Sequence, residues 1–192
     1  MSTLNVGTIA SKTGNSAITI ADNSNVTFSN NPIGIQPINQ VASQATTSGT
    51  SKDFTVPSTA RQIFLSLKDF QFTGGTSSVG VQLGDSGGIE TSGYVSTVTY
   101  TGGGHTNDGG HADSNTIFLI YYESAQNNPI SGFVHMISTV PNEFYYHAQI
   151  RHQDYVSNSA GYKTLSNPIT TVRILTAGGH TLNGGSCALA YI

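Results

Sequence analysis

The stretch Val81-Gln82-Leu83-Gly84-Asp85-Ser86-Gly87-Gly88-Ile89-Glu90-Thr91-Ser92-Gly93-Tyr94-Val95-Ser96 decides how the rest of the chain is interpreted. Two β-prone runs flank a centre of glycine, aspartate and serine, which supply the backbone freedom and local hydrogen bonds of tight turns. The stretch therefore predicts two strands with a connection at residues 84–88. The functional question is whether Ser86 is a nucleophile or only part of that connection, and we favour the connection.

The centre of this stretch, GDSGG, is also the string that many trypsin-like proteases carry at their nucleophile. Such an enzyme needs histidine, aspartate and serine in that chain order, but all six histidines of this chain follow Ser86. Ile89 stands where the protease motif has proline. The protease interpretation therefore fails on the order of its catalytic residues.

A GDS-type esterase is the second enzyme interpretation, because it pairs an early GDS with a later Asp-x-x-His. Asp108-Gly109-Gly110-His111 has that spacing. The esterase fold is a helix-flanked parallel sheet, however, and the chain shows no convincing amphipathic helix. Its Asp-x-x-His element also belongs near the C-terminus. We therefore predict that the protein is not an enzyme and has no catalytic residues.

The composition is that of a β-protein with an uncharged surface. Of 192 residues, 36% are hydrophobic and only 9% are charged, whereas about 25% charged is usual. Nine tyrosines and eight phenylalanines can build a core, which argues against disorder. The net charge is −3 without a basic cluster, so we expect no nucleic-acid binding. No run approaches about 18 apolar residues, so we expect no membrane insertion, and Met1–Asn5 does not predict a signal peptide.

From about residue 52 onward, short β-type runs alternate with turn signals. Several short strands at this spacing are typical of a sandwich or barrel. The predicted strands are 52–56, 61–72, 78–83, 92–100, 115–123, 131–139, 143–151, 169–176 and 185–192.

Residues 1–45 differ from the rest, because Phe28 is their only aromatic residue. Short β-type pieces at 17–20 and 25–28 flank a turn signal. Such a segment cannot bury a core alone, so it is a flexible tail or an arm that pairs with another chain, and its β-prone pieces favour the arm. We therefore divide the chain into an arm, 1–45, and a β-domain, 46–192. Residues 40–51 are a linker or a polar first strand.

The predicted strand 61–72 changes the parity of its apolar residues. Side chains alternate strictly between the two faces of a strand. All the apolar residues can face one core only if a bulge falls near Lys68-Asp69. The residues concerned are Ile63, Leu65 and Leu67, followed by Phe70 and Phe72.

The last predicted strand contains the single cysteine, Cys187, so no intrachain disulfide can form. We expect Cys187 to be a small buried residue. Its face also carries Leu189 and Tyr191, and the opposite face carries only Ser186, Ala188 and Ala190. Small residues on one side suit the close approach of a neighbouring sheet or subunit.

One Gly-rich loop contains the candidate metal ligands, because two imidazoles with carboxylates can bind zinc or a similar ion. The loop GGHTNDGG (103–110) has a near copy, GGHTLNGG (178–185), in which glycine supplies positive φ and the polar residues make turn contacts. Spacing within such a loop fixes little geometry, so we predict no metal and no cofactor. The candidates are His105, Asp108, His111 and Asp113.

Two tyrosine pairs, Tyr121-Tyr122 and Tyr145-Tyr146, place one ring on each face of their strands. The inward rings belong to the core, and the outward rings can stack on sugars or on a subunit interface. The sequence leaves both alternatives open. His135 shares its parity with Phe133 and Ile137, which favours a hydrogen-bonded, half-buried residue over a ligand.

Several blocks of the chain resemble one family in the same order. They are VQLGDSGGIETSGYVS (81–96), SGTSKDFTVPSTARQIFLSLKDFQFTGGTS (48–77), KTL (163–165), ITTVRI (169–174), the closing segment 178–192, and the leader MSTLNVGTI. They resemble the β-domain of tail-fibre and other minor virion proteins of tailed bacteriophages, especially marine and cyanobacterial ones. The chain departs from that family in having no tryptophan and in having Leu182 where an aromatic residue is frequent.

The resemblance implies a jelly-roll-like antiparallel sandwich preceded by an extended, β-prone N-terminal arm. It also implies a homotrimer on the exterior surface or tail of the virion. The expected role is a fibre or surface-decoration subunit that contacts other virion proteins through residues 1–45. The alternative is a receptor-binding module that binds a host surface carbohydrate during adsorption. No catalytic residue follows from the resemblance.

Overall fold

The computed structural model describes residues 8–10, 16–20, 26–28, 38–75, 77–102, 110–123, 129–152 and 155–192. These residues form strands and turns without a helix, so the predicted all-β class is confirmed. Within this described part of the chain, no helix has the length and apolarity to cross a membrane. The chain divides into two compact units, Met1–Ile38 and Asn39–Ile192.

The first unit contains a small antiparallel sheet in the order β1-β2-β3. Strand β2 pairs with both neighbours, through Thr19 with Thr8 and through Ile18 with Phe28. The β-type pieces predicted at 17–20 and 25–28 are therefore strands. The bounds are β1 Thr8–Ala10, β2 Ser16–Ile20 and β3 Val26–Phe28.

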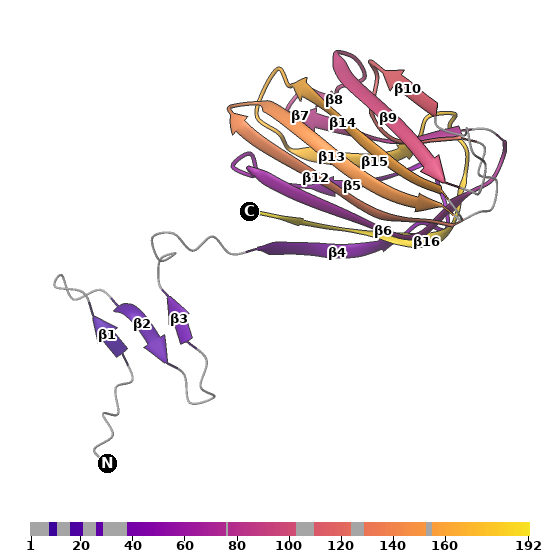
Figure 1. The fold of residues 1–192 in the computed structure, drawn as a ribbon. Coiled ribbons are helices and arrows are strands. Elements are labelled where there is room, and N and C mark those ends of the chain that lie inside the picture. The colour runs from indigo at the N-terminus through magenta and orange to yellow at the C-terminus, as the bar shows by residue number, and fades with distance from the viewer. Residues whose placement is uncertain are drawn as a thin grey trace. The chain divides into compact units, whose positions relative to one another are not determined.

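The second unit is an antiparallel β-sandwich (Figure 1). Its larger sheet has eight strands in the order β10-β9-β14-β13-β12-β6-β16-β4. Their bounds are β4 Asn39–Ala45, β6 Gln62–Phe72, β9 Tyr94–Gly102, β10 Gly110–Ser114, β12 Ile130–Val140, β13 Glu143–His152, β14 Tyr155–Thr164 and β16 Leu182–Tyr191.

The smaller sheet has five strands in the order β11-β7-β15-β5, with β8 paired to β7. Their bounds are β5 Ser51–Thr55, β7 Ser77–Asp85, β8 Gly88–Ile89, β11 Phe118–Glu123 and β15 Thr171–Thr176. The predicted antiparallel sandwich is confirmed, and the jelly-roll connectivity stays a prediction.

The core lies between the two sheets and follows from the alternation of side chains along each strand. In β13 every second residue, from Phe144 to His152, is buried. Burial of apolar surface contributes roughly 25 cal/mol per Å², so these faces stabilise the sandwich. Five fully buried phenylalanines come from strands of both sheets: Phe54, Phe70, Phe72, Phe118 and Phe144.

The bulge predicted near Lys68-Asp69 is confirmed. Opposite β12, the partner of Ile130 is Phe70 and the partner of Gly132 is Leu67, so β6 carries one extra residue. Asp69 has φ 52°, which marks the irregular position. The bulge turns the apolar residues on both of its sides toward the same core.

The boundary between the units differs from the predicted one. Residues 39–45, which we assigned to the arm, form β4, and β4 pairs with β16 through Val41 with Leu189. The β-domain therefore begins at Asn39 instead of residue 46. Of the two interpretations of residues 40–51, the polar first strand is the one observed up to Ala45. The segment has one large apolar residue, Val41, which packs on the core, so its sequence carries only a weak strand signal.

Besides the two-residue strand β8, two further strands, β10 and β14, are missing from the predicted set. The residues of β14 are mostly polar or small, and its core-facing positions include Ser157 and Ser159. The predicted strand 115–123 is shorter in the structure, where β11 begins at Phe118, and a separate strand, β10, precedes it. Both missed strands are held by pairing to their neighbours and lack an apolar alternation of their own.

Candidate binding surface

The GDSGG segment is a β-hairpin between β7 and β8, with Ser86 exposed at its turn. One oxygen of the Asp85 carboxylate accepts a hydrogen bond from Gly87 N at 2.7 Å. The other oxygen accepts from Asn167 N at 2.8 Å and from its side-chain amide at 3.2 Å. The bond from Gly87, assisted by those from Asn167, lowers the pKa of Asp85. Asp85 thus holds both its own turn and a neighbouring loop.

Glu90 anchors the same loop from the other side of the hairpin. Its carboxylate accepts a hydrogen bond from Ser166 N at 2.7 Å and forms an ion pair with the buried ammonium of Lys163. Burial by itself raises the pKa of Glu90, but the hydrogen bonds from Lys163 and Ser166 outweigh it and lower that pKa. Among the described residues, the Ser86 hydroxyl makes no hydrogen bond. The polar groups around the hairpin therefore hold the backbone in place.

The four metal candidates fall partly outside the described residues, since His105 and Asp108 lie in the segment 103–109. His111 and Asp113 lie two residues apart on β10, exposed and on the same face. No group of three or more metal-binding side chains occurs in the described part of the chain.

The near copy of the Gly-rich loop uses its histidine as a packing residue. The His180 ring stacks on Phe72 with the ring centroids 6.1 Å apart. The ring also lies against the backbone of Gly178, where a Cβ atom would stand 2.5 Å from Nε2 of His180. A Cβ atom at this position would force the His180 ring to move.

The two tyrosine pairs divide between the core and the surface. Tyr121 and Tyr146 are buried, whereas Tyr122 and Tyr145 are exposed. The Tyr146 hydroxyl donates to Leu119 O at 2.9 Å, and Ser96 Oγ, 2.6 Å away, accepts from Leu119 N at 2.7 Å. These bonds connect the larger sheet to β11 of the smaller one. Burial raises the pKa of Tyr146 to about 12, so its hydroxyl keeps its proton.

The exposed aromatic residues gather on what we call the outer face, the side of the eight-stranded sheet that is turned away from the five-stranded sheet. Tyr145 on β13 stands opposite Tyr162 on β14, with the ring centroids 6.0 Å apart. The pairing continues from Tyr162 to Val95 and from Tyr145 to Ile137. This row of four apolar side chains crosses four neighbouring strands (Figure 1).

Most of the exposed large apolar side chains of the described chain lie on this outer face. Nine large apolar side chains of the described residues are exposed, and all but Ile38 and Tyr122 belong to this face. A concentration of this kind marks an interaction site more often than scattered surface residues do. The seven are Phe64, Val95, Phe133, Ile137, Val140, Tyr145 and Tyr162.

The centre of the outer face has no charged side chain. Its middle row runs through Thr97, Ala160, His147, His135 and Phe64. His135 is half buried, as predicted, but its ring stacks on Phe64 at 4.5 Å, and its Nε2 finds no hydrogen-bond partner among the described residues. The charged residues that lie on this face are all at its perimeter: Lys68, Asp113, Glu143 and Arg151.

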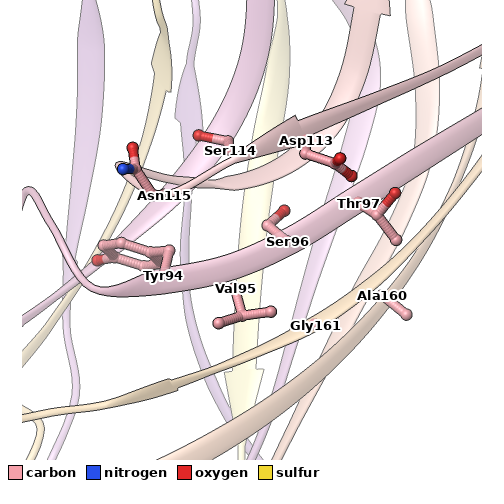
Figure 2. A pocket seen from close by; sticks show the side chains of 9 residues that line it. All are labelled: Tyr94, Val95, Ser96, Thr97, Asp113, Ser114, Asn115, Ala160 and Gly161. Atoms are coloured by element: carbon pink, nitrogen blue, oxygen red, sulfur yellow. The ribbon is translucent and has the colours of Figure 1, made fainter.

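The outer face has two shallow grooves. The first groove, of about 860 Å³, is lined by residues of β9, β14 and β10 and by Asn115, which follows β10 (Figure 2). It combines Val95 and Ala160 with the polar Thr97, Asp113 and Asn115. The second, of about 700 Å³, lies between Phe64 and Phe133 over the small residues Ser66, Ala188 and Ala190.

The sequence indicates the outward residues of each strand but not the surface that they form together. Tyr145 was a sequence candidate, whereas Val95, Tyr162, Phe64 and Phe133 were not. The alternation along β6, β9 and β12 would have identified Phe64, Val95 and Phe133 as outward, whereas β14, which carries Tyr162, gives no such signal. Their grouping depends on the order of the strands in the sheet, which no local signal encodes.

Comparisons with known proteins identify no relative: no family model, no curated protein and no solved structure matches the chain. The fold and the outer face therefore carry the functional argument.

Proposed function

We propose that the protein is a structural subunit of a bacteriophage particle, a fibre or surface-decoration protein that works by assembly. The observation that carries the proposal is the outer face, which gathers exposed apolar side chains around an uncharged centre and has charges only at its perimeter. Protein interfaces have this anatomy, with charged residues depleted at the core and polar groups at the rim. The resemblance of the ordered sequence blocks to those of phage virion proteins supports the proposed location, and it implies the homotrimer and the jelly-roll connectivity.

In this proposal the two units have different tasks. The unit of residues 1–38 contacts other virion proteins, and the sandwich of residues 39–192 projects from the particle. The attachment segment is thus shorter than the predicted arm, because β4 belongs to the sandwich.

The test is the location of the protein in phage particles whose genome encodes it. We expect mass spectrometry of purified particles to detect the chain, and electron microscopy to place it on the exterior surface or the tail. Deleting residues 2–38 should prevent incorporation while the remaining sandwich still melts cooperatively. Particles that lack the wild-type protein would contradict the proposal.

A host carbohydrate receptor is the second candidate, and a specific feature favours it. The exposed Tyr162 stands opposite Val95, which lines a groove that also carries the carboxylate of Asp113 and the amide of Asn115. Sugars bind through ring stacking combined with such hydrogen-bonding groups. A glycan array and a whole-cell adsorption assay test this role, and blank results in both would exclude it.

A further inference from the structure

We infer that the groove between β9, β10 and β14 binds an uncharged saccharide that carries an acetamido group, an N-acetylhexosamine. This inference rests on the carbohydrate-binding candidate of the proposed function and deepens it by naming the kind of sugar. It assigns one groove of the outer face and leaves the other groove, over Ala188 and Ala190, without a ligand.

The hollow of this groove comes from one small side chain beside larger ones. Ala160 is exposed on β14, and the next residue on the same face is Tyr162, whose side chain is 42% exposed. On β9 Val95 stands opposite Tyr162 and is 52% exposed. Because alternate residues of a strand share a face, these two side chains form an apolar wall beside the methyl group of Ala160. The tyrosine ring in this wall offers a surface on which a sugar ring stacks.

The polar side chains at the β10 edge of the groove are Asp113 and Asn115 (Figure 2). Both are exposed, and neither side chain hydrogen-bonds to another described residue. The Ser96 and Ser114 hydroxyls also line the groove, but they already accept from backbone N–H groups. A ligand therefore meets a carboxylate that accepts hydrogen bonds and an amide that both donates and accepts.

These groups are complementary to an acetamido group. Its N–H donates to the Asp113 carboxylate, its carbonyl accepts from the Asn115 amide, and its methyl group packs on Val95 or Ala160. A few placed polar groups around an apolar lining are the usual means by which a site selects its ligand. A plain hexose, with a hydroxyl in place of the acetamido group, supplies neither the methyl group nor the second polar contact.

The charges near the groove disfavour an acidic sugar. Asp113 is negative, and the described outward residues of β9, β10 and β14 include no lysine or arginine. Lys163 on β14 is buried in an ion pair. Arg151 lies four residues beyond His147, the β13 partner of Ala160, which is about 13 Å along the strand. The carboxylate of a uronic or sialic acid would therefore meet a like charge without a cation to balance it.

The pairing of the strands argues against a peptide as the occupant. A sheet that recognises an extended peptide pairs with it through the backbone of an edge strand. Strand β9 is paired on both sides, with β10 and β14, and β14 is paired with β9 and β13. Recognition over these strands therefore depends on side chains, which suits a saccharide.

Saccharides that differ in one substituent test the inference, with NMR titration of the full-length chain as the measurement. Chitotriose, the trimer of N-acetylglucosamine, and cellotriose, the trimer of glucose, differ only in the acetamido group. Chitotriose should bind about tenfold or more tightly than cellotriose, because the polar groups of the site lose their partners with the hydroxyl. Equal binding of the two would overturn the assignment.

A hyaluronan hexasaccharide, in which glucuronic acid alternates with N-acetylglucosamine, tests the charge. It should bind about tenfold more weakly than chitotriose. Asp113→Asn keeps an acceptor for the acetamido N–H and removes the negative charge, so it should narrow this difference to within about threefold. A difference that Asp113→Asn leaves unchanged would contradict the role of the carboxylate.

Two matched pairs of variants locate the site. Ala160→Leu fills this groove and should weaken chitotriose binding about tenfold or more, whereas Ala188→Leu fills the other groove and should leave it unchanged. Tyr162→Ser should also weaken binding, whereas Tyr122→Ser, which removes a ring of the same 42% exposure from the smaller sheet, should not. Equal melting temperatures within each pair would show that the variants are folded.

The outcomes separate this inference from the proposed function. Chitotriose binding that Ala160→Leu does not weaken overturns the inference, and so does a glycan array on which only other saccharides bind, although the receptor role then stands. A chain that binds no saccharide overturns both of these and leaves the structural role standing. A peptide that binds in place of chitotriose and is lost with Ala160→Leu also overturns the inference. Chitotriose binding by a chain that is absent from purified phage particles overturns the virion role alone.

Discussion

The backbone of Gly185 in β16 lies directly against the carbonyl group of Asp69 in β6. Both residues have positive φ, 83° for Gly185 and 52° for Asp69. The contact is so close that a Cβ atom on Gly185 would stand less than 3.0 Å from the Asp69 oxygen. The bulge that turns both halves of β6 toward the core is therefore matched by an irregularity in the neighbouring strand.

Replacing Gly185 should destabilise the sandwich strongly. Gly185→Ala combines a strained φ with a clash against backbone that cannot move away, so we expect a loss of about 3 kcal/mol in the free energy of unfolding. Gly179→Ala is the matched control, because Gly179 has φ 68° but no atom within 4 Å of its Cβ position. It should lose only about 1 kcal/mol. Urea unfolding measures both, and equal losses would disprove the backbone clash.

The Tyr146 hydroxyl should contribute to the joining of the two sheets. Tyr146→Phe removes the donor to the buried Leu119 O and leaves Ser96 Oγ with only its bond from Leu119 N, which should cost about 1 to 2 kcal/mol. Tyr145→Phe, in which the ring is exposed, should change the free energy of unfolding by no more than about 0.5 kcal/mol. Two indistinguishable variants in chemical denaturation would argue against the role of this hydroxyl.

The Lys163–Glu90 ion pair should contribute more than the exposed pair of Arg173 with Asp53. Lys163→Met leaves the Glu90 carboxylate without its cation, and we expect a loss of about 2 to 4 kcal/mol. Arg173→Met breaks a pair that is open to solvent and should cost less than about 1 kcal/mol. A double-mutant cycle with Glu90→Gln measures the coupling, and a coupling near zero would show that the pair does not act as a unit.

His152 should make stability depend on pH. Burial lowers its pKa from 6.5 in the folded protein, so acid favours the unfolded chain, which binds the proton more readily. This contribution is constant above pH 6.5 and declines as the pH falls below that value, by at most about 1.4 kcal/mol per pH unit. His152→Gln should remove this component. Thermal melts from pH 8 to pH 5 that run parallel for the two proteins would refute it.

Asp85 and Ser86 should differ in effect although they are neighbours. Ser86→Ala should leave the free energy of unfolding within about 0.5 kcal/mol of wild type, because the hydroxyl makes no hydrogen bond with the described residues. Asp85→Asn should lower the melting temperature at pH 7, since a carboxylate that accepts from Gly87 and Asn167 is lost. The lowered pKa of Asp85 means that its stabilisation is present above pH 3.8 and is lost as the pH falls through the folded pKa. The difference from wild type should therefore narrow in acid, and a gap independent of pH would contradict this.

Local patterns predicted much of the sandwich because a strand records its environment in alternate residues. The parity change between Leu67 and Phe70 predicted the bulge, and Cys187 is buried in the last strand as expected. The split of each tyrosine pair into one buried and one exposed ring follows from the same alternation. The turn at residues 84–88 was predicted, but the short strand β8 that pairs with β7 there was not.

Strands without apolar alternation were missed, because their positions are held by neighbours. Ser157 and Ser159 face the core in β14, where small side chains fit between the sheets. Strand β4 depends on pairing with β16, so its start could not be predicted from its own polar residues.

By itself, the sequence determined the all-β class, the inward face of most strands and the bulge in β6, because each depends on side chains within a few residues of one another. Only the tertiary structure decided that Val95, Ile137, Tyr145 and Tyr162 form one row. Strand order and register bring together residues that lie far apart in the chain. The outer face, and the assembly that we propose for it, exist only once those pairings have formed.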